Sequence, residues 1–163
     1  MTKKNLLQLL IGFLTIVPLV AGCTSQDRPD TEADASAIND IWTEYASRLN
    51  DGDIDRWISL WTEEGVQLPP NAPPVIGKDR IRVGMKRALD QFTFNIEITN
   101  AEVEVVGNWA FSRGAFTRTD TPKEGGQPVF FDGKYMTILE RQADDSWKIH
   151  RDIFNSNVAS GGE

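Results

Sequence analysis

The hydrophobic period of this chain changes near residue 95, and this change restricts the fold more than any other feature of the sequence. Before it, apolar residues recur at spacings of three and four, as on one side of an amphipathic helix. After it, apolar and polar residues alternate, as in a strand with one buried face. Helices followed by a run of strands predict an α+β domain, with the apolar helix faces packed on one side of a sheet.

Three helices are expected in the first half of this domain. The first begins at Ala35 and ends at the turn sequence Asn-Asp-Gly, residues 50–52. Asp53 can cap the second helix, because its carboxylate can accept hydrogen bonds from free backbone N–H groups. The apolar stripe of that helix runs to Trp61, and Gly65 ends it.

The third helix follows Gly77 and extends to about Phe92. A short strand, residues 66–68, and a proline-rich segment, residues 69–74, precede it. Four of the six residues in that segment are proline, so it lacks the backbone donors that a helix or a central strand needs. We expect an extended loop there.

Four strands are expected in the second half, joined by short turns rich in glycine and aspartate. Their predicted ranges are 96–106, 108–119, 129–141 and 147–157. Short turns between consecutive strands predict an antiparallel meander.

The N-terminus has the pattern of a signal peptide. Lys3 and Lys4 precede an apolar run, residues 6–21. The alternative is a transmembrane helix, but the run contains a proline and is shorter than the roughly 20 residues that a bilayer span needs. The run ends in Leu-Val-Ala-Gly-Cys, and Cys23 is the only cysteine of the chain, which excludes an intramolecular disulfide.

This ending resembles the lipobox of bacterial lipoproteins, in which the cysteine is lipidated and becomes the mature N-terminus. The resemblance implies a lipid-anchored protein of the bacterial cell envelope, and Thr24 implies an outer-membrane protein facing the periplasm if the host is Gram-negative. Acyl chains hold a protein to a membrane without a span. We expect a signal peptide over 1–22, lipidated Cys23 and a flexible tether over 23–34, the folded domain over 35–157 and a flexible tail over 158–163.

Several classes of function find no support in the sequence. A net charge of −7 with scattered basic residues argues against a nucleic-acid partner. One histidine and one cysteine give no credible metal site, and no cofactor motif or nucleophile elbow is present. The histidine, His150, is interpreted as a surface or interface side chain, because on a strand it points away from Ile149 and Arg151.

Polar residues on apolar strand faces are the remaining candidates for a site. Alternation places Arg113 on one face with Trp109 and Phe111. In the last strand it places five residues on one face: Trp147, Ile149, Arg151, Ile153 and Asn155. An arginine on an apolar face is costly unless it is paired, so the two arginines indicate either buried ion pairs or a pocket for an anionic or polar ligand.

Several short segments carry a family resemblance: Asn50-Asp51-Gly52-Asp53-Ile54-Asp55-Arg56-Trp57, Leu68-Pro69-Pro70-Asn71, Ile76-Gly77-Lys78, Ser112-Arg113-Gly114, Gly133-Lys134-Tyr135 and residues 146–157. Together they resemble the SnoaL-like and DUF4440 branch of the nuclear transport factor 2-like (NTF2-like) superfamily, over about residues 35–157. The resemblance implies three helices held by a curved antiparallel sheet, a cone with an apolar pocket, and homodimers formed through the sheet.

The superfamily contains ketosteroid isomerases, polyketide cyclases, dehydratases, epoxide hydrolases and binding modules, so the fold does not decide the function. The place that matches the catalytic aspartate of the isomerases is Pro69, which has no proton to transfer. Steroid isomerase chemistry is therefore not expected.

Three hypotheses follow, and whether the chain is an enzyme stays open. The favoured one is a membrane-anchored homodimer whose cone binds a small apolar or amphiphilic ligand, without a cofactor or metal. The expected pocket residues are Tyr45, Trp57, Trp61, Trp109, Arg113, Tyr135, Arg151 and Asn155.

The second hypothesis is an enzyme of the isomerase, hydratase or cyclase type. Asp152 or a glutamate near the mouth of the pocket would be its base, and Tyr135 or Arg113 would stabilise an oxyanion or enolate. Regular alternation turns Asp152 away from the face of Arg151, and only a bulge would reverse this. The third hypothesis is a module that associates with another envelope protein, indicated by an exposed apolar patch without a cavity beneath it.

Overall fold

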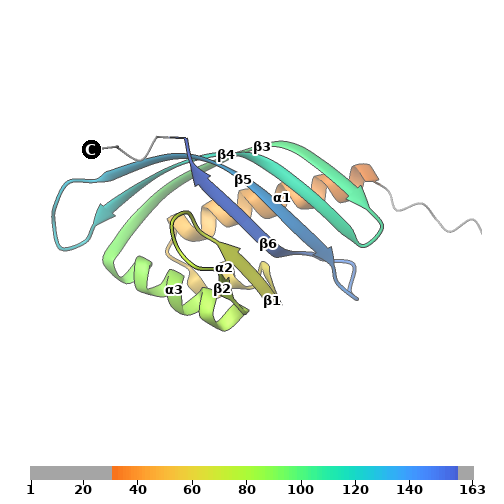
Figure 1. The fold of residues 1–163 in the computed structure, drawn as a ribbon, viewed down its shortest axis with the longest axis horizontal. Coiled ribbons are helices and arrows are strands. Elements are labelled where there is room, and N and C mark those ends of the chain that lie inside the picture. Colours follow the sequence, from red (N-terminus) through yellow and green to blue (C-terminus); the bar gives the residue numbers. More distant parts are fainter. Residues whose placement is uncertain (1–30, 158–163) are drawn as a thin grey trace, which may run out of the picture.

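The computed structural model describes residues 31–157. The predicted signal peptide, lipidated Cys23, most of the tether and the tail lie outside these residues. Three helices pack against one side of a curved sheet (Figure 1). They are α1 (Thr31–Asn50), α2 (Ile54–Ile58) and α3 (Lys78–Gln91). Helix α1 thus begins four residues before the predicted start and includes the end of the predicted tether.

The sheet has six strands in the order β2-β1-β6-β5-β4-β3. Their bounds are β1 (Trp61–Leu68), β2 (Val75–Ile76), β3 (Phe92–Val106), β4 (Trp109–Pro122), β5 (Val129–Arg141) and β6 (Trp147–Ser156). Strands β3 to β6 form the predicted antiparallel meander. Strand β1 pairs with β6 in parallel, however, so the sheet is mixed rather than purely antiparallel. This pairing joins the helical half of the chain to its last strand.

The second helix is shorter than predicted, because tertiary pairing overrides the helical pattern. It ends at Ile58, and Trp61 begins strand β1. The backbone N–H of Ile149 in β6 donates to the carbonyl of Leu60 at 2.8 Å, which draws this segment into the sheet. Trp61 is nevertheless fully buried, so the sequence pattern indicated the right buried residue on the wrong element.

Two further boundaries differ from the prediction. Phe92 is extended and begins β3, although we expected it at the end of the third helix. A two-residue strand, β2, follows the proline-rich loop and pairs with β1. Both residues of β2 pair with β1, so β2 adds one short strand at this edge of the sheet.

The two ends of α1 are fixed to the sheet by side chains. At its start, Asp34 forms an ion pair with Arg141 and accepts a hydrogen bond from Trp147 Nε1 at 3.1 Å. At its end, the Asn50 side chain accepts from the backbone N–H of Ile96 at 2.7 Å and donates to its carbonyl at 3.0 Å. Strand β3 is an edge of the sheet. The two hydrogen bonds of Asn50 satisfy the backbone of Ile96 there, as a neighbouring strand would.

Helix α1 and the inner face of the sheet enclose the core. Its fully buried members include Ile38, Trp57, Trp61, Leu139 and Ile149. Burial of each such side chain contributes about 2 kcal/mol. Within residues 31–157, no helix combines the length and the apolar character that a membrane span requires.

Candidate functional site

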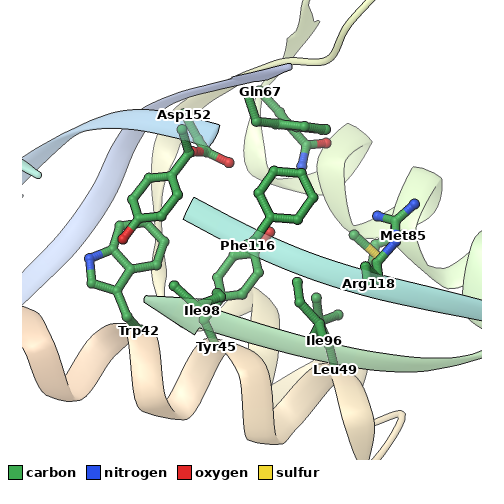
Figure 2. Close-up of a pocket in the computed structure, with 12 residues that line it drawn as sticks. Trp42, Tyr45, Leu49, Gln67, Met85, Ile96, Ile98, Phe116, Arg118 and Asp152 are labelled. Carbon is green, nitrogen blue, oxygen red and sulfur yellow. The ribbon is translucent and has the colours of Figure 1, made fainter. Parts of the chain in front are cut away.

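A cavity of about 50 Å³ lies between α1, α3 and the inner face of the sheet (Figure 2). Its walls are largely aromatic and aliphatic, with a few polar groups among them. The lining residues are Trp42, Tyr45, Leu49, Gln67, Met85, Ile96, Ile98, Phe116, Arg118, Tyr135, Asp152 and Phe154. Such a composition is typical of a small-molecule site, where apolar walls give affinity and a few polar groups give orientation.

Aromatic rings form one continuous wall of this cavity. The rings of Trp42 and Tyr135 lie 4.6 Å apart, and Trp42 and Tyr45 lie 5.7 Å apart, between centroids. Tyr45 in turn meets the edge of Trp57 at 5.3 Å. Tilted and edge-on contacts of this kind are the favoured geometries of aromatic pairs. The wall is thus anchored in the core through Trp57.

A buried carboxylate, Asp152, faces this apolar cavity. Asp152 is 4% exposed, and Figure 2 shows its side chain on the sheet side of the cavity, opposite α1. The Thr137 hydroxyl donates a hydrogen bond to Asp152 Oδ1 at 2.7 Å. No basic side chain within residues 31–157 forms an ion pair with it. Burial raises the pKa of Asp152 from 3.8 to about 6, against the opposing effect of the Thr137 hydrogen bond.

The hydroxyl of Tyr135 is held in a polar chain at the end of the cavity. It donates to Asn100 Oδ1 at 3.0 Å, and the same oxygen accepts from the Ser112 hydroxyl at 2.8 Å. Ser112 accepts from Trp42 Nε1 at 2.9 Å. The proton of Tyr135 is therefore engaged, and this residue mainly supplies its ring to the cavity.

The hydroxyl of Tyr45 lies within electrostatic reach of two charges. Burial raises the pKa of Tyr45 strongly, the Asp152 carboxylate raises it further, and the Arg118 guanidinium lowers it. The phenol therefore stays protonated at every physiological pH. A protonated phenol can donate a hydrogen bond to an oxygen atom of a bound molecule.

Arg118 is fixed by its neighbours on three sides. Its guanidinium carbon lies 5.0 Å from the ring centre of Phe94 and 4.7 Å from that of Phe131. Its Nε lies 2.7 Å from Asp120 Oδ1, and one terminal nitrogen donates to Asp120 Oδ2 at 2.9 Å. Two rings and one carboxylate thus hold the planar group, and its N–H groups that do not face Asp120 are the ones that a ligand can reach.

Three of the predicted site residues line the cavity: Tyr45, Tyr135 and Asp152. Trp57 and Trp61 are fully buried in the core, so they support the cavity wall without reaching the cavity. The other predicted residues lie elsewhere, for reasons that can be traced to the strands that carry them.

A bulge in β6 explains where Arg151 and Asp152 point. The ladder with β5 shifts by one residue at His150, between Ile149 and Arg151. An extra residue reverses the alternation beyond it. Ile149 faces the core before the bulge and Asp152 faces it afterwards, whereas Arg151 turns outward and donates to the carbonyl of Glu64 at 3.1 Å. The prediction that Arg151 shares a face with Ile149 is wrong.

Trp109 and Arg113 also lie on the outer face of the sheet, and Asn155, near the end of β6, does not line this cavity either. Arg113 forms an ion pair with Glu102 of the neighbouring strand and is half-exposed. Arg113 is thus paired, as one alternative expected, but the ion pair is partly exposed rather than buried. The inward positions of β4 are taken instead by Ser112 and, further on, by cavity residues that the sequence analysis did not select.

His150 lies outside the cavity, and both of its polar side-chain contacts are made by the same ring nitrogen. Its Nδ1 lies 3.1 Å from the Thr62 hydroxyl and 3.5 Å from Glu140 Oε2. A relay needs two different ring nitrogens, one for each partner. The ring also meets the edge of Trp109 at 5.2 Å. Burial, and secondarily the charge of Arg151, lowers the pKa of His150.

The sequence analysis missed several cavity residues, notably Gln67, Met85, Phe116, Arg118 and Phe154. Phe116 and Arg118 alternate in step with buried Ser112, so the period of β4 could have identified them. Phe154 follows the bulge and could not be placed from alternation alone. Within residues 31–157, no group of histidine, cysteine and carboxylate side chains could hold a metal ion.

Solved structures share this fold. A ketosteroid isomerase-like protein from Erwinia carotovora atroseptica is 25% identical, with 76% of this chain and 95% of that chain covered and a TM-score of 0.69. An NTF2-like superfamily protein from Salmonella enterica is 16% identical, with 80% and 96% covered and a TM-score of 0.72. A type 2 hexachlorocyclohexane dehydrochlorinase is 19% identical, with 79% and 88% covered and a TM-score of 0.71.

No curated protein matches the chain. The structural neighbours establish an NTF2-like fold, in which helices pack on a curved sheet. The sequence model of one family within this fold, the SnoaL-like domain, matches residues 42–150. That stretch spans most of the described domain, including both Trp42 and the His150 bulge. This chain therefore belongs to the SnoaL-like domain family.

Proposed function

We propose that this domain binds a small apolar or amphiphilic molecule in its cavity and transfers a proton on it, with Asp152 as general base. The reaction type would be that of an isomerase, a hydratase or a cyclase. One observation carries the proposal: a buried carboxylate without a cationic partner faces an aromatic cavity. Burial of an unpaired carboxylate is costly for a fold, so such a group indicates a role other than stability.

The pKa of Asp152, about 6, suits this role. Near neutral pH most of the carboxyl is ionised and able to accept a proton, and its conjugate acid is acidic enough to return that proton. Asp152 would take a proton from a C–H bond of the substrate, and the electron pair of that bond would move toward an acceptor oxygen. The proton would then return to another atom of the substrate or to a leaving oxygen.

Two donors near the cavity could stabilise the negative oxygen formed in that step. The Tyr45 phenol stays protonated, and Arg118 has N–H groups that do not face Asp120. Hydrogen-bond donors that are fixed before the reaction contribute most to such stabilisation. These two residues take the place of Tyr135 and Arg113, which the sequence had suggested for it.

The names of structural neighbours support this reaction class. One is described as ketosteroid isomerase-like and another as a dehydrochlorinase. At these identities the likeness establishes the fold of this chain and not its reaction.

The test is proton exchange at carbon. A panel of small aryl ketones is incubated with the protein in D₂O, and loss of the α-proton signal is followed by NMR. We expect exchange catalysed by the wild type, rising with pH through an apparent pKa near 6, and none by Asp152→Asn. Asp79→Asn, an exposed substitution on α3, serves as the control. Equal exchange by Asp152→Asn and the wild type would overturn the assignment of Asp152.

A second candidate function is binding without turnover. It is favoured by the two hydrogen bonds that occupy possible catalytic groups, from Thr137 to Asp152 and from Tyr135 to Asn100. The same panel separates the two functions. Ketones that bind, seen as quenching of tryptophan fluorescence, but exchange no proton would indicate a binding protein.

We also propose that Cys23 carries the lipid anchor of an envelope lipoprotein. The apolar run that ends in Leu-Val-Ala-Gly-Cys supports this. Metabolic labelling with a radioactive fatty acid should mark the full chain and leave Cys23→Ser unlabelled, and label on the serine variant would contradict the proposal.

Finally, we propose a homodimer formed through the outer face of the sheet. Large apolar side chains are exposed there, including Trp109, Phe111, Met136, Ile138 and Ile153. Exposed apolar patches of this kind mark interaction surfaces. Because a cavity lies beneath the sheet as well, this patch does not by itself favour the association module over ligand binding.

A further inference from the structure

A second cavity adjoins the first on the inner side of the sheet. It has a volume of about 80 Å³ and is lined by Pro70, Phe116, Arg118, Phe131, Asp132, Phe154, Asn155 and Ser156. Three of these side chains, Phe116, Arg118 and Phe154, also line the first cavity. The two cavities are therefore separated by these three side chains, and no helix or strand of residues 31–157 runs between them.

Two aromatic rings form most of this partition. The rings of Phe116 and Phe154 meet edge to face, with centroids 6.1 Å apart and an angle of 80° between the planes. Both residues are half-buried, whereas the core residues around them are fully enclosed. Side chains of this kind can change rotamer without disturbing a close-packed core.

A glycine makes room for one of these rings. A Cβ atom at Gly133 would lie 2.5 Å from Phe116 Cε1 and 2.6 Å from the carbonyl oxygen of Asn155. Glycine weakens a strand interior, and it commonly marks a place where another group approaches closely. The backbone of Gly133 does not adopt a positive φ, so space, not backbone conformation, explains a glycine at this position.

The third member of the partition is rigid and polar. Arg118 lies within 5.0 Å of the ring centres of Phe94 and Phe131 and is paired with Asp120. Rotation of the two rings would leave its guanidinium in place, in a residue that lines both cavities. An oxygen acceptor of a ligand that crosses the partition could therefore bind the N–H groups of Arg118 that do not face Asp120.

The small volume of the first cavity favours such a crossing for any but the smallest ligand. A water molecule occupies roughly 10 to 15 Å³ of volume measured in this way, so the first cavity holds about four. A drug-sized or metabolite-sized molecule needs more room than that.

We propose that the two cavities are the halves of one ligand site, divided by a movable partition of Phe116 and Phe154, and that the ligand is an elongated amphiphile. One apolar group would fill the cavity beside Asp152, a second would fill the outer cavity, and a carbonyl or other acceptor oxygen between them would bind Arg118. This inference rests on the proposed function, and it adds the shape of the ligand and the position of its oxygen.

The test uses a homologous series of n-alkyl phenyl ketones, from propiophenone to octanophenone, titrated calorimetrically into residues 24–163. Those residues include every helix and strand described above. Each methylene that gains an apolar surrounding improves affinity about fourfold. In Phe116→Ala the partition is open. The affinity for a long ketone, divided by the affinity for propiophenone, should therefore be at least tenfold larger in this variant than in the wild type.

Phe154→Ala should show the same gain, because it removes the other half of the partition. A preference for long ketones that is equal in the wild type and in both alanine variants would overturn the single-site inference while leaving binding itself established. Absence of binding of every ketone to the wild type would overturn the proposed function and, with it, this inference. Thermal melts show whether each variant is folded.

The position of the oxygen has its own readout. Wild-type protein should bind octanophenone about tenfold more tightly than n-octylbenzene, which lacks the carbonyl. The double variant Arg118→Met with Asp120→Asn removes the guanidinium without leaving an unpaired buried carboxylate, and it should bind both compounds equally. An unchanged preference in that variant would exclude Arg118 as the acceptor's partner.

Discussion

Asp152 should make the folded protein less stable at neutral pH than a neutral side chain would. Its pKa is about 6 in the fold and near 3.8 when unperturbed. Between these two values the native state holds a proton that the unfolded state has lost, so stability falls as pH rises. Below about pH 3 both states are protonated, and the group costs nothing. Above about pH 7 the full cost is present, and a pKa difference of roughly two corresponds to about 3 kcal/mol.

Asp152→Asn removes this cost while keeping the shape of the side chain. The Thr137 hydroxyl can donate to the amide oxygen as it does to the carboxylate. The variant should therefore be more stable than the wild type by about 3 kcal/mol at pH 7.5 and nearly equal to it at pH 3.

Urea unfolding of residues 24–163, followed by tryptophan fluorescence at several pH values, measures this difference directly. Trp42, Trp57 and Trp61 are buried and report on the fold. A difference between variant and wild type that stays constant from pH 3 to pH 7.5 would refute the reasoning, since it would mean that Asp152 has the same pKa in both states. A gain in stability together with a loss of proton exchange would show a site maintained at the expense of stability.

Three further predictions concern packing and assembly. Gly133→Ala should lower the free energy of unfolding by about 1 to 3 kcal/mol, because its Cβ would overlap Phe116. Gly84→Ala, on α3, meets nothing within 4 Å and should raise the free energy of unfolding by up to about 1 kcal/mol. Urea unfolding measures both, and equal effects would contradict the packing argument. Asp34→Ala should cost about 3 kcal/mol, since it leaves a largely buried arginine and an indole N–H without their acceptor; a melting temperature within a degree of the wild type would contradict this. Met136→Lys, at the centre of the exposed outer face, should shift the mass in light scattering from dimer to monomer without lowering the melting temperature, whereas a variant that remains dimeric would place the interface elsewhere.

The order and type of most elements could be predicted from the sequence, because two different hydrophobic periods separate the halves of the chain. The helical stripe of α1 and the alternation of β4 and β5 each depend on local geometry, so they are visible in the sequence. The segment from Trp61 to Gly65 shows the limit of this approach. Its spacing fits a helix, but hydrogen bonding to β6 makes it a strand.

The candidate site could be predicted only in part, for a related reason. Tyr45 and Tyr135 lie on elements whose buried faces follow the regular period, and both line the cavity. Asp152 does so only because one extra residue interrupts β6, and the ladders with both neighbouring strands are irregular near that point. Such a shift is decided by pairing between strands distant in sequence. It therefore cannot be predicted from the alternation of apolar and polar residues within one strand.

The position of β3 at an edge of the sheet has a consequence for solubility. An open edge of 15 residues is a template on which another chain could add a strand, and edge-to-edge addition leads to aggregates. Three features of β3 oppose this: the Asn50 side chain occupies the backbone groups of Ile96, the ladder with β4 is interrupted near Ala101, and the glutamates at 97 and 104 place negative charge on the strand. A protein with an apolar outer face can therefore associate through that face while its edge resists polymerisation.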